Sequence, residues 1–414
     1  MAQSAQVDFA SVQGNLKTVF AGYENAIPSE AILMREFSFE SGSKVGDEYQ
    51  YGVELTRPHG HTTAAPGVFP ALNQPVARQA PKAKLQPYQH YLRERVTYDI
   101  LSRCQDSSQA AKAELGATIE SMRESMMFRQ EVFALYGQSG LAVIGTVTGD
   151  TITLTLGSYA SGMWAGNENM PLTIRDSAGT TVIKDVTILS VADSTRVLTL
   201  NPGDGTSLVA GQTVWFQGGG PTTEPVGISK IILNTGSLYN IDAAAYGLWK
   251  GNNLALGGTE DLGFKRAIQL DAQIRSRGGM GDQLGLVNPD VYTTLVGSVE
   301  AARDFGGSDQ YKTAEIDRGT RQLRYFSPTG CTTIMAHPLV KHSDYFSLRR
   351  KKWFRAGATD PTGNIPGEGG KVLFDLQDYP GKELRMMANN TWFTPRPAAS
   401  GMVTNISWGG TVLA

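Results

Sequence analysis

Four of the five histidines fall in two pairs whose spacing could hold a metal ion. His59 and His61 flank one glycine, and His337 and His342 flank a short stretch that begins with Pro338. A catalytic zinc site takes three protein ligands and a structural site takes four. No further ligand follows either pair at a regular spacing. The first pair also lies in a Gly/Pro-rich stretch, where outer contacts orient a ligand poorly. We therefore interpret both pairs as loop residues and expect no metal site.

Motifs that carry catalysis or hold cofactors are missing from the sequence. It contains no G-x-x-x-x-G-K-[S/T], no G-x-S-x-G and no H-E-x-x-H pattern. The glycines around Met280 do not follow a strand and open a helix, so they indicate a loop. Cys104 and Cys331 are too few for a disulfide framework and are interpreted as reduced core residues. We expect no catalytic residue, no cofactor and no enzymatic activity.

One run of basic residues could contact an anionic partner. Only Asp344 interrupts it, and Trp353 and Phe354 lie between its members. Such a run fits either phosphate groups of nucleic acid or an acidic patch on a neighbouring subunit. We favour the subunit contact and leave the nucleic-acid contact open. The members are Lys341, Arg349, Arg350, Lys351, Lys352 and Arg355.

Composition narrows the class of protein further. The 414 residues carry 37 basic and 39 acidic side chains, a net charge of −2, so the chain is not a dedicated nucleic-acid binder with a basic excess. Hydrophobic residues make up 41%, enough for folded cores, whereas charged residues make up only 18%, below the usual value of about 25%. The first residues do not resemble a signal peptide, and no apolar run approaches the ~18 residues of a membrane span. We expect a soluble protein made in a cytoplasm, with much of its surface against partners.

The elements that would position these residues follow a distinctive order. Residues 1–35 form a polar arm, and residues 36–92 form a long extended excursion with strands at 49–56 and 82–91 around an irregular tip. Residues 93–140 contain a helix at 106–136 with one apolar stripe, and Gly137 ends it. The stripe consists of Leu115, Ile119, Met122, Met126, Phe133 and Tyr136.

In the rest of the chain, the spacing of hydrophobic residues changes twice. Residues 141–220 alternate in six short runs separated by turn signals, which predicts an inserted all-β sandwich or barrel. Residues 221–414 mix helices at 260–277 and 289–305 with strands that include 345–354 and 383–393. The fold class is therefore α+β.

This order resembles the major capsid protein of tailed bacteriophages, with the HK97-type fold. The stretch VGDEYQYGV at 45–53 resembles the start of the family's E-loop, and 106–136 resembles its spine helix in the P-domain. The stretch LGLVNPDVY at 284–292 resembles the strand-into-helix segment of the A-domain, and residues 240–252 resemble the segment joining the two. The module at 141–220 resembles insertions that some members carry. By this resemblance, 1–35 is the N-terminal arm, 36–92 the E-loop, 93–140 the P-domain, and 221–414 the A-domain with returning P-domain strands.

The resemblance implies a structural subunit that assembles into hexamers and pentamers of an icosahedral shell around double-stranded DNA. The expected partners are further copies of the chain, scaffolding and portal proteins, a cement protein on the outer face, and DNA through weak contacts, with no membrane. The expected location is the virion capsid, assembled in the host bacterial cytoplasm. The subunit-contact candidates in the E-loop are Lys44, Tyr49, Tyr51, Arg57 and Phe69.

Three other readings stay open on the sequence. An encapsulin-like compartment resembles the same fold but loads an enzyme instead of DNA. A β-rich tail or carbohydrate-binding component would use 141–218 as its working part. A metal hydrolase would use His59, His61 and His337.

Overall fold

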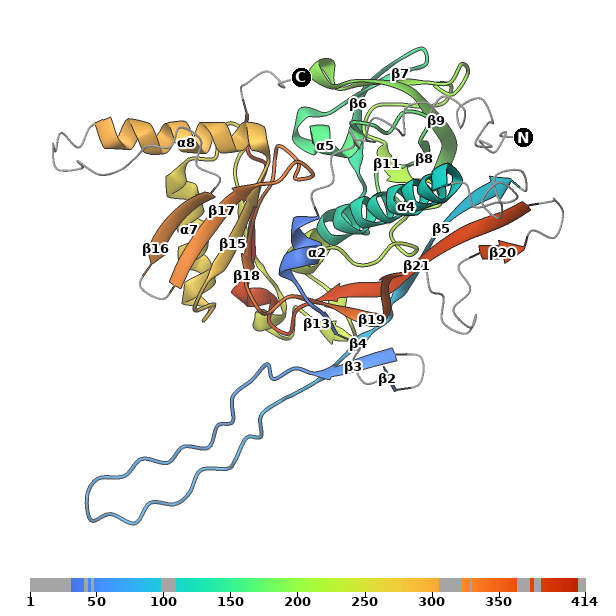
Figure 1. Ribbon diagram of the computed structural model, residues 1–414. Helices are drawn as coiled ribbons and strands as arrows, with labels where there is room; N and C mark the ends of the chain where they lie inside the picture. Colours follow the sequence, from blue (N-terminus) through green and yellow to red (C-terminus); the bar gives the residue numbers. More distant parts are fainter. Residues whose placement is uncertain are drawn as a thin grey trace.

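The computed structural model describes residues 31–40, 44–45, 48–97, 109–304, 322–327, 330–362, 373–375 and 381–408. Within them, one long helix crosses a five-stranded sheet, a small barrel lies above it, a six-stranded sheet lies to one side, and a thin arm extends away from the body (Figure 1). The α+β class expected from the sequence is confirmed.

The long helix α4 (Gln109–Tyr136) packs on the five-stranded sheet through methionines. Met122 and Met126 of α4 lie in one buried cluster with Leu384 and Met386 of the sheet. Strand β5 pairs antiparallel with β21 along its length and forms one edge of the sheet. The strands are β1 (Phe39–Glu40), β5 (Tyr88–Thr97), β19 (Phe354–Thr362), β20 (Leu373–Asp375) and β21 (Gly381–Phe393).

The second half of α4 is more enclosed than its apolar stripe predicts. Ile119 belongs to the stripe but is 38% exposed, whereas every residue from Gln130 to Gly137 is buried. Two short helices, α2 (Ile32–Glu36) and α6 (Ile228–Ile232), pack against this end. A one-sided stripe therefore does not describe the second half of the helix.

Six strands between the helix and residue 217 close into a barrel in the order β10-β7-β6-β11-β8-β9. All six were predicted from alternation, and closure removes the exposed strand edges that an open sheet would have. Short helices η2 (Leu156–Ser158), α5 (Ser161–Trp164) and η3 (Asp193–Thr195) connect them. The strands are β6 (Ala142–Thr148), β7 (Thr151–Leu154), β8 (Pro171–Arg175), β9 (Val182–Ala192), β10 (Val197–Leu200) and β11 (Thr213–Phe216).

A mixed six-stranded sheet with two helices forms the remaining layer. Helices α7 (Phe264–Ser276) and α8 (Pro289–Asp304) pack on it around Leu270, Val291 and Leu295. The sheet order is β14-β22-β18-β15-β17-β16. Its strands are β14 (Asn252–Ala255), β15 (Gln283–Val287), β16 (Gln322–Ser327), β17 (Gly330–Ala336), β18 (Tyr345–Arg349) and β22 (Gly401–Thr404).

Two stretches predicted as single strands are each divided between two sheets. The stretch 82–91 breaks at Pro87, so that β4 (Lys82–Leu85) stays with the arm while β5 joins β21. The stretch 345–354 breaks at a turn where Lys351 has φ +62°, and β18 and β19 then enter different sheets. The prediction was wrong in both places because alternation shows that a segment is extended but not which strand it pairs with.

Candidate interaction site at the extended arm

The arm is defined here as residues 53–81, between β3 (Glu48–Gly52) and β4. Its two sides are joined by sparse main-chain hydrogen bonds, from Val53 N to Pro81 O at 3.0 Å and from Leu55 N to Gln79 O at 3.2 Å. Further out, His59 and Val76 form an isolated bridge. Figure 1 shows this ribbon leaving the body on its own. A two-stranded ribbon is marginally stable alone in water, so the arm's geometry favours a partner that lies against it.

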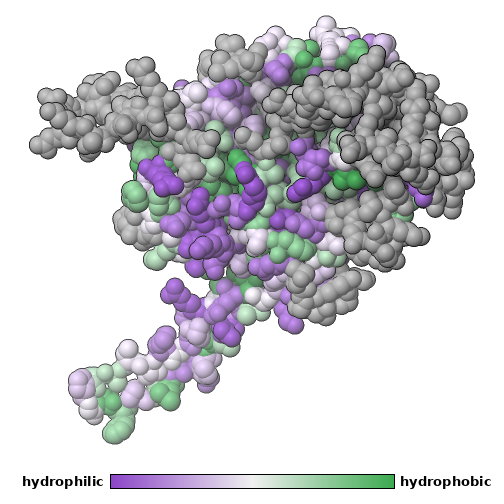
Figure 2. Space-filling model, viewed as in Figure 1, coloured by the Kyte–Doolittle hydropathy of each residue, from purple (hydrophilic) through white to green (hydrophobic). Residues whose placement is uncertain are grey.

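The tip of the arm carries the most exposed large apolar side chains in the described part of the chain. Phe69 is fully exposed and Leu72 is 86% exposed, with Val68 and Val76 also more than half exposed. Figure 2 shows green, hydrophobic atoms at the end of the arm. Such apolar surface on an extension marks an interaction site, because leaving it in water is unfavourable.

An aromatic cluster holds the root of the arm against the body. The Tyr51 ring is stacked on Phe393 at 5.1 Å and tilted against Phe354 at 5.3 Å, between ring centroids. Tyr49 is buried in the same cluster. Both tyrosines were expected to be subunit contacts, but their rings pack within the chain. Strand β2 (Lys44–Val45) pairs with β3 here, while the Lys44 side chain lies outside the described residues.

The hairpin of β12 (Ser237–Leu238) and β13 (Ile241–Asp242) holds the root of the arm in place. We call this hairpin the clip. Its two turn residues, Tyr239 and Asn240, both have positive φ, at 53° and 64°. Lys84 N of β4 donates to Tyr239 O at 3.0 Å, and the Tyr239 hydroxyl donates to Trp392 O at 2.6 Å. Left-handed backbone at a tyrosine costs about 1–3 kcal/mol and persists only where its surroundings hold it. The clip therefore joins the arm to β21 through one strained residue.

The residues of the predicted basic run lie in different environments in the structure. Lys351 and Lys352 are exposed and have no ion pair among the described residues. Arg350 Nε lies 3.2 Å from Glu36 Oε1. Arg355 is 4% exposed, pairs with Asp360, and donates to the carbonyl oxygens of Met34 and Phe37. Contrary to expectation, Arg355 does not belong to an exposed cluster.

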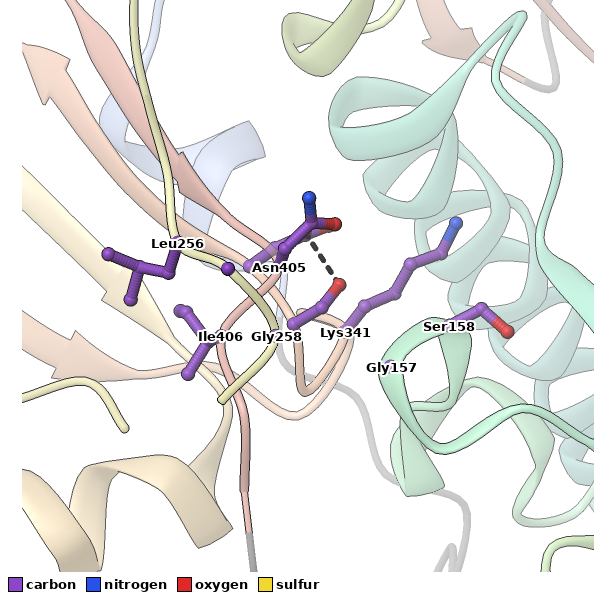
Figure 3. A pocket seen from close by; sticks show the side chains of 10 residues that line it. Gly157, Ser158, Leu256, Gly258, Lys341, Asn405 and Ile406 are labelled. Atoms are coloured by element: carbon purple, nitrogen blue, oxygen red, sulfur yellow. Dashed lines mark hydrogen bonds between the residues drawn. The ribbon is translucent and has the colours of Figure 1, made fainter. Parts of the chain in front are cut away.

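Lys341, also expected in that cluster, is buried beside a pocket of about 550 Å³ (Figure 3). Its Nζ donates to Gly140 O at 2.9 Å and lies 4.1 Å from the centre of the Tyr136 ring. The Tyr136 hydroxyl donates to Asp344 Oδ2 at 3.0 Å. Burial lowers the pKa of Lys341 to about 8, and it raises the pKa of the Asp344 carboxyl. These groups connect α4 to the loop before β18. Lys341 therefore stabilises the interior of the protein and is not part of a contact surface.

The histidines weighed as metal ligands are separated in the same way. His59 and His61 are exposed on the arm, while His337 is buried and lies 3.0 Å from Glu131 Oε1 through Nε2. His342 Nε2 lies 2.9 Å from Asp290 Oδ2. Among the described residues, no three His, Cys, Asp or Glu side chains are grouped so that they could hold a metal ion. The set proposed for a metal hydrolase is therefore not brought together. Cys331 is a free, half-buried thiol, and Cys104 lies outside the described residues.

Two buried glutamates were not singled out from sequence. Glu131 accepts from Leu33 N at 2.6 Å and Met34 N at 3.1 Å, besides contacting His337, so it connects α2, α4 and the loop after β17. Glu224 accepts from Gln138 N at 3.2 Å, and burial raises the pKa of its carboxyl to about 7. Glu131 lies outside the apolar stripe of the helix, so periodicity predicts it to be exposed.

Comparison with known proteins identifies the fold. No family model matches the chain, and no curated protein does. Among solved structures, a chain of the cyanophage A-1(L) capsid asymmetric unit matches with a TM-score of 0.53 at 10% identity, covering 94% of this chain and 96% of that one. A native GTA particle capsid matches at 0.48, 9% identity and 94% of both chains, and the SrpI encapsulin from Synechococcus elongatus PCC 7942 at 0.42, 9% identity and 99% of both chains.

The first of these similarities shows that the chain has the fold of a phage capsid chain over nearly its whole length. Within the described residues, no helix is long and apolar enough to cross a membrane.

Proposed function

We propose that this protein is the structural subunit of an icosahedral capsid of a tailed bacteriophage, with the HK97-type fold. It assembles into hexamers and pentamers that enclose double-stranded DNA. The fold similarity to the cyanophage capsid chain supports the class. The observation that carries the function is the arm, whose tip exposes apolar residues such as Phe69 and Leu72 to water.

The elements take the family's roles in this proposal. The arm and its root are the E-loop, α4 is the spine helix of the P-domain, and the six-stranded sheet is the core of the A-domain. The barrel is an insertion on the P-domain. Scaffolding and portal proteins assist assembly, a cement protein binds the outer face, and packaged DNA makes weak, non-specific contacts. Assembly takes place in the host cytoplasm.

Deleting the outer arm tests the proposal. Residues 58–77 are replaced by Asn-Gly, a pair that favours a tight hairpin turn, while the buried root residues Val53 and Leu55 are kept. Wild-type protein is expected to give closed shells in negative-stain microscopy. The shortened protein should remain folded, with an unchanged circular dichroism spectrum, but form no closed shells.

A matched variant separates length from surface chemistry. The double substitution Phe69→Ser and Leu72→Ser keeps the arm length and removes the exposed apolar surface, so we expect shell yield to fall about tenfold or more. Wild-type protein that forms no shells, or a shortened arm that assembles normally, would contradict the proposal. Sequencing nucleic acid from purified shells separates a capsid from an enzyme-loaded compartment.

A further inference from the structure

A charged pocket lies where the arm leaves the body. Its lining residues are far apart in the sequence. The cavity has a volume of about 440 Å³. The first residues of the arm form one wall, and Leu248, Lys352, Pro395 and Arg396 form the other. These segments are brought together because β3, the turn before β19 and the turn after β21 converge on the aromatic cluster of the root. We call this cavity the root pocket.

The root pocket has an excess of positive charge. Arg57, Lys352 and Arg396 line it, against one carboxylate, Glu54. Glu54 Oε2 already lies 3.3 Å from Arg78 Nη1 on the arm. Arg57, Lys352 and Arg396 are all exposed and have no ion pair in the part of the chain that the structure describes. Three exposed cations around one cavity repel each other, so the arrangement favours an anionic occupant.

Arg396 also lies near a second arginine, Arg349, which is outside the root pocket. The pKa of Arg349 is lowered mainly by burial and further by the positive charges of Arg275 and Arg396, against the raising effect of Asp282. Arg396 therefore lies close enough to another guanidinium to interact with it. Of the six basic residues in the run read from the sequence, only Lys352 lines the root pocket, where Arg57 and Arg396 join it.

The chain itself can supply the opposite charge. Its net charge is −2, so a local positive excess must be balanced by negative surface elsewhere on the same chain. Residues 141–218, for example, carry three basic and six acidic side chains. Opposite charges on separate surfaces of one chain suit head-to-tail contacts, which close into rings when the rotation allows it. The pocket also adjoins the arm, so a copy lying against the arm lies next to the pocket.

We propose that the root pocket binds an acidic surface of a second copy of this chain, beside the place where the arm lies on that copy. The inference rests on the proposed function and adds to it an electrostatic contact that sets the register of the arm. Complementary charges mainly steer association and suppress wrong pairings, and salt weakens exposed ones. Assembly is accordingly most sensitive to the pocket at low subunit concentration and at low salt.

Charge reversal tests the root pocket. The double variant Lys352→Glu/Arg396→Glu is compared with Lys351→Glu, an equal reversal at the neighbouring exposed residue that does not line the pocket. After nuclease treatment, shell yield is measured by sedimentation at 50–500 mM NaCl. We expect the double variant to lose about tenfold or more in yield, Lys351→Glu to stay within about twofold, and Lys352→Arg to behave as wild type. Thermal unfolding of the free subunits checks that each variant is folded.

Two further measurements make each outcome decisive. Analytical ultracentrifugation of free subunits at low salt should show association of wild type that Lys352→Glu/Arg396→Glu weakens, whether or not shells form. Wild type that associates in this way without forming shells contradicts the proposed function but not the pocket. A double variant that associates and assembles as wild type does overturns the pocket. Binding of a 30-base-pair DNA duplex, lost in the double variant while assembly is unchanged, assigns the pocket to phosphate and also overturns the proposal.

Discussion

Buried ionisable side chains hold the C-terminal half of α4 in place. Glu131, fully buried, contacts main-chain N–H groups of α2 and the ring of His337. One turn later, Tyr136 connects to Lys341 and Asp344. A buried charge is tolerated only where hydrogen bonds satisfy it, and removing one partner leaves the other uncompensated. These residues therefore fix how the helix, the N-terminal segment and the six-stranded sheet meet.

The buried Glu224 carboxyl makes the free energy of unfolding depend on pH. Its pKa is raised to about 7 by burial, against lowering by Gln138 N, Arg129 and Arg175, and its ordinary value is 4.5. The folded chain then binds the proton more tightly than the unfolded chain, so this contribution is present below pH 4.5 and is lost as the pH rises to 7. At about 1.4 kcal/mol for each pKa unit, the free energy of unfolding falls by about 2–3 kcal/mol between pH 5 and pH 8.

The variant Glu224→Gln should lack this decrease. Urea unfolding of free subunits at pH 5 and pH 8 measures it as the difference between wild type and variant, which cancels the other titrating groups. Glu168→Gln, at an exposed carboxylate of the barrel, is the control and should follow wild type at both pH values. Parallel pH profiles for wild type and Glu224→Gln would contradict the assignment.

At the scale of elements, the clip and the arm root behave as one unit. The cluster around Phe393 contains the rings of Tyr51, Trp249 and Phe354, and Tyr239 packs both on this cluster and on the main core. The arm's direction is thus set by a small cluster that Tyr239 connects to the main core. Because an arm that pointed elsewhere would miss its neighbour, the proposed assembly depends on this cluster.

Replacing Tyr239 of the clip by alanine should destabilise the root of the arm. Tyr239→Ala removes the hydroxyl bond to Trp392 O and the ring that lies 5.8 Å from Phe393, while leaving a left-handed turn that the ring no longer stabilises. We expect amide exchange in β3 and β4 to become about tenfold faster, and exchange in the barrel to stay unchanged. Hydrogen–deuterium exchange with mass spectrometry measures both in one experiment.

Tyr246→Phe is the matched control for the clip. Tyr246 also contacts the arm, through Gln79 Oε1 at 2.6 Å, but this bond is exposed and worth little. Its loss should leave exchange in β3 and β4 within about twofold of wild type. Equal effects of Tyr246→Phe and Tyr239→Ala would mean that the clip has no special role.

At the scale of the whole molecule, charge is distributed unevenly between the barrel and the root of the arm. Residues 141–218 are acidic, with three basic against six acidic side chains, which suits neither contact with DNA nor a packed inner surface. The root pocket carries the opposite charge and lies where the arm leaves the body. Figure 1 shows the arm leaving the body at the other end of the molecule from the barrel. We therefore expect the barrel to face the outside of the shell.

Cysteine labelling tests this orientation. In protein whose two native cysteines are replaced by serine, Val209→Cys places a thiol on the barrel, where Val209 is 58% exposed. A large maleimide should label it in intact shells as completely as in free subunits. Phe69→Cys on the arm should be labelled in free subunits and protected in shells. Labelling at position 209 only after shells are dissociated would place the barrel inside.

Local patterns in the sequence determined the elements themselves. Alternation predicted all six barrel strands, and the 3–4 spacing of apolar residues predicted α4 and α7, because the hydrophobic period depends only on residues close together in the chain. The extended excursion between the two strands at the arm root was also predicted, since a stretch rich in Gly and Pro with no period supports neither helix nor core.

Only the tertiary structure decided which strands pair and which charges are exposed. Extended segments at 82–97 and 345–362 change sheets midway, and Lys341, Arg355 and Glu131 are buried although they read as surface residues. The root pocket likewise combines Arg57, Lys352 and Arg396 from three distant segments. Strand pairing and burial depend on contacts between residues that are far apart in the chain. Such contacts do not produce a hydrophobic period in the local sequence, so the sequence alone does not reveal them.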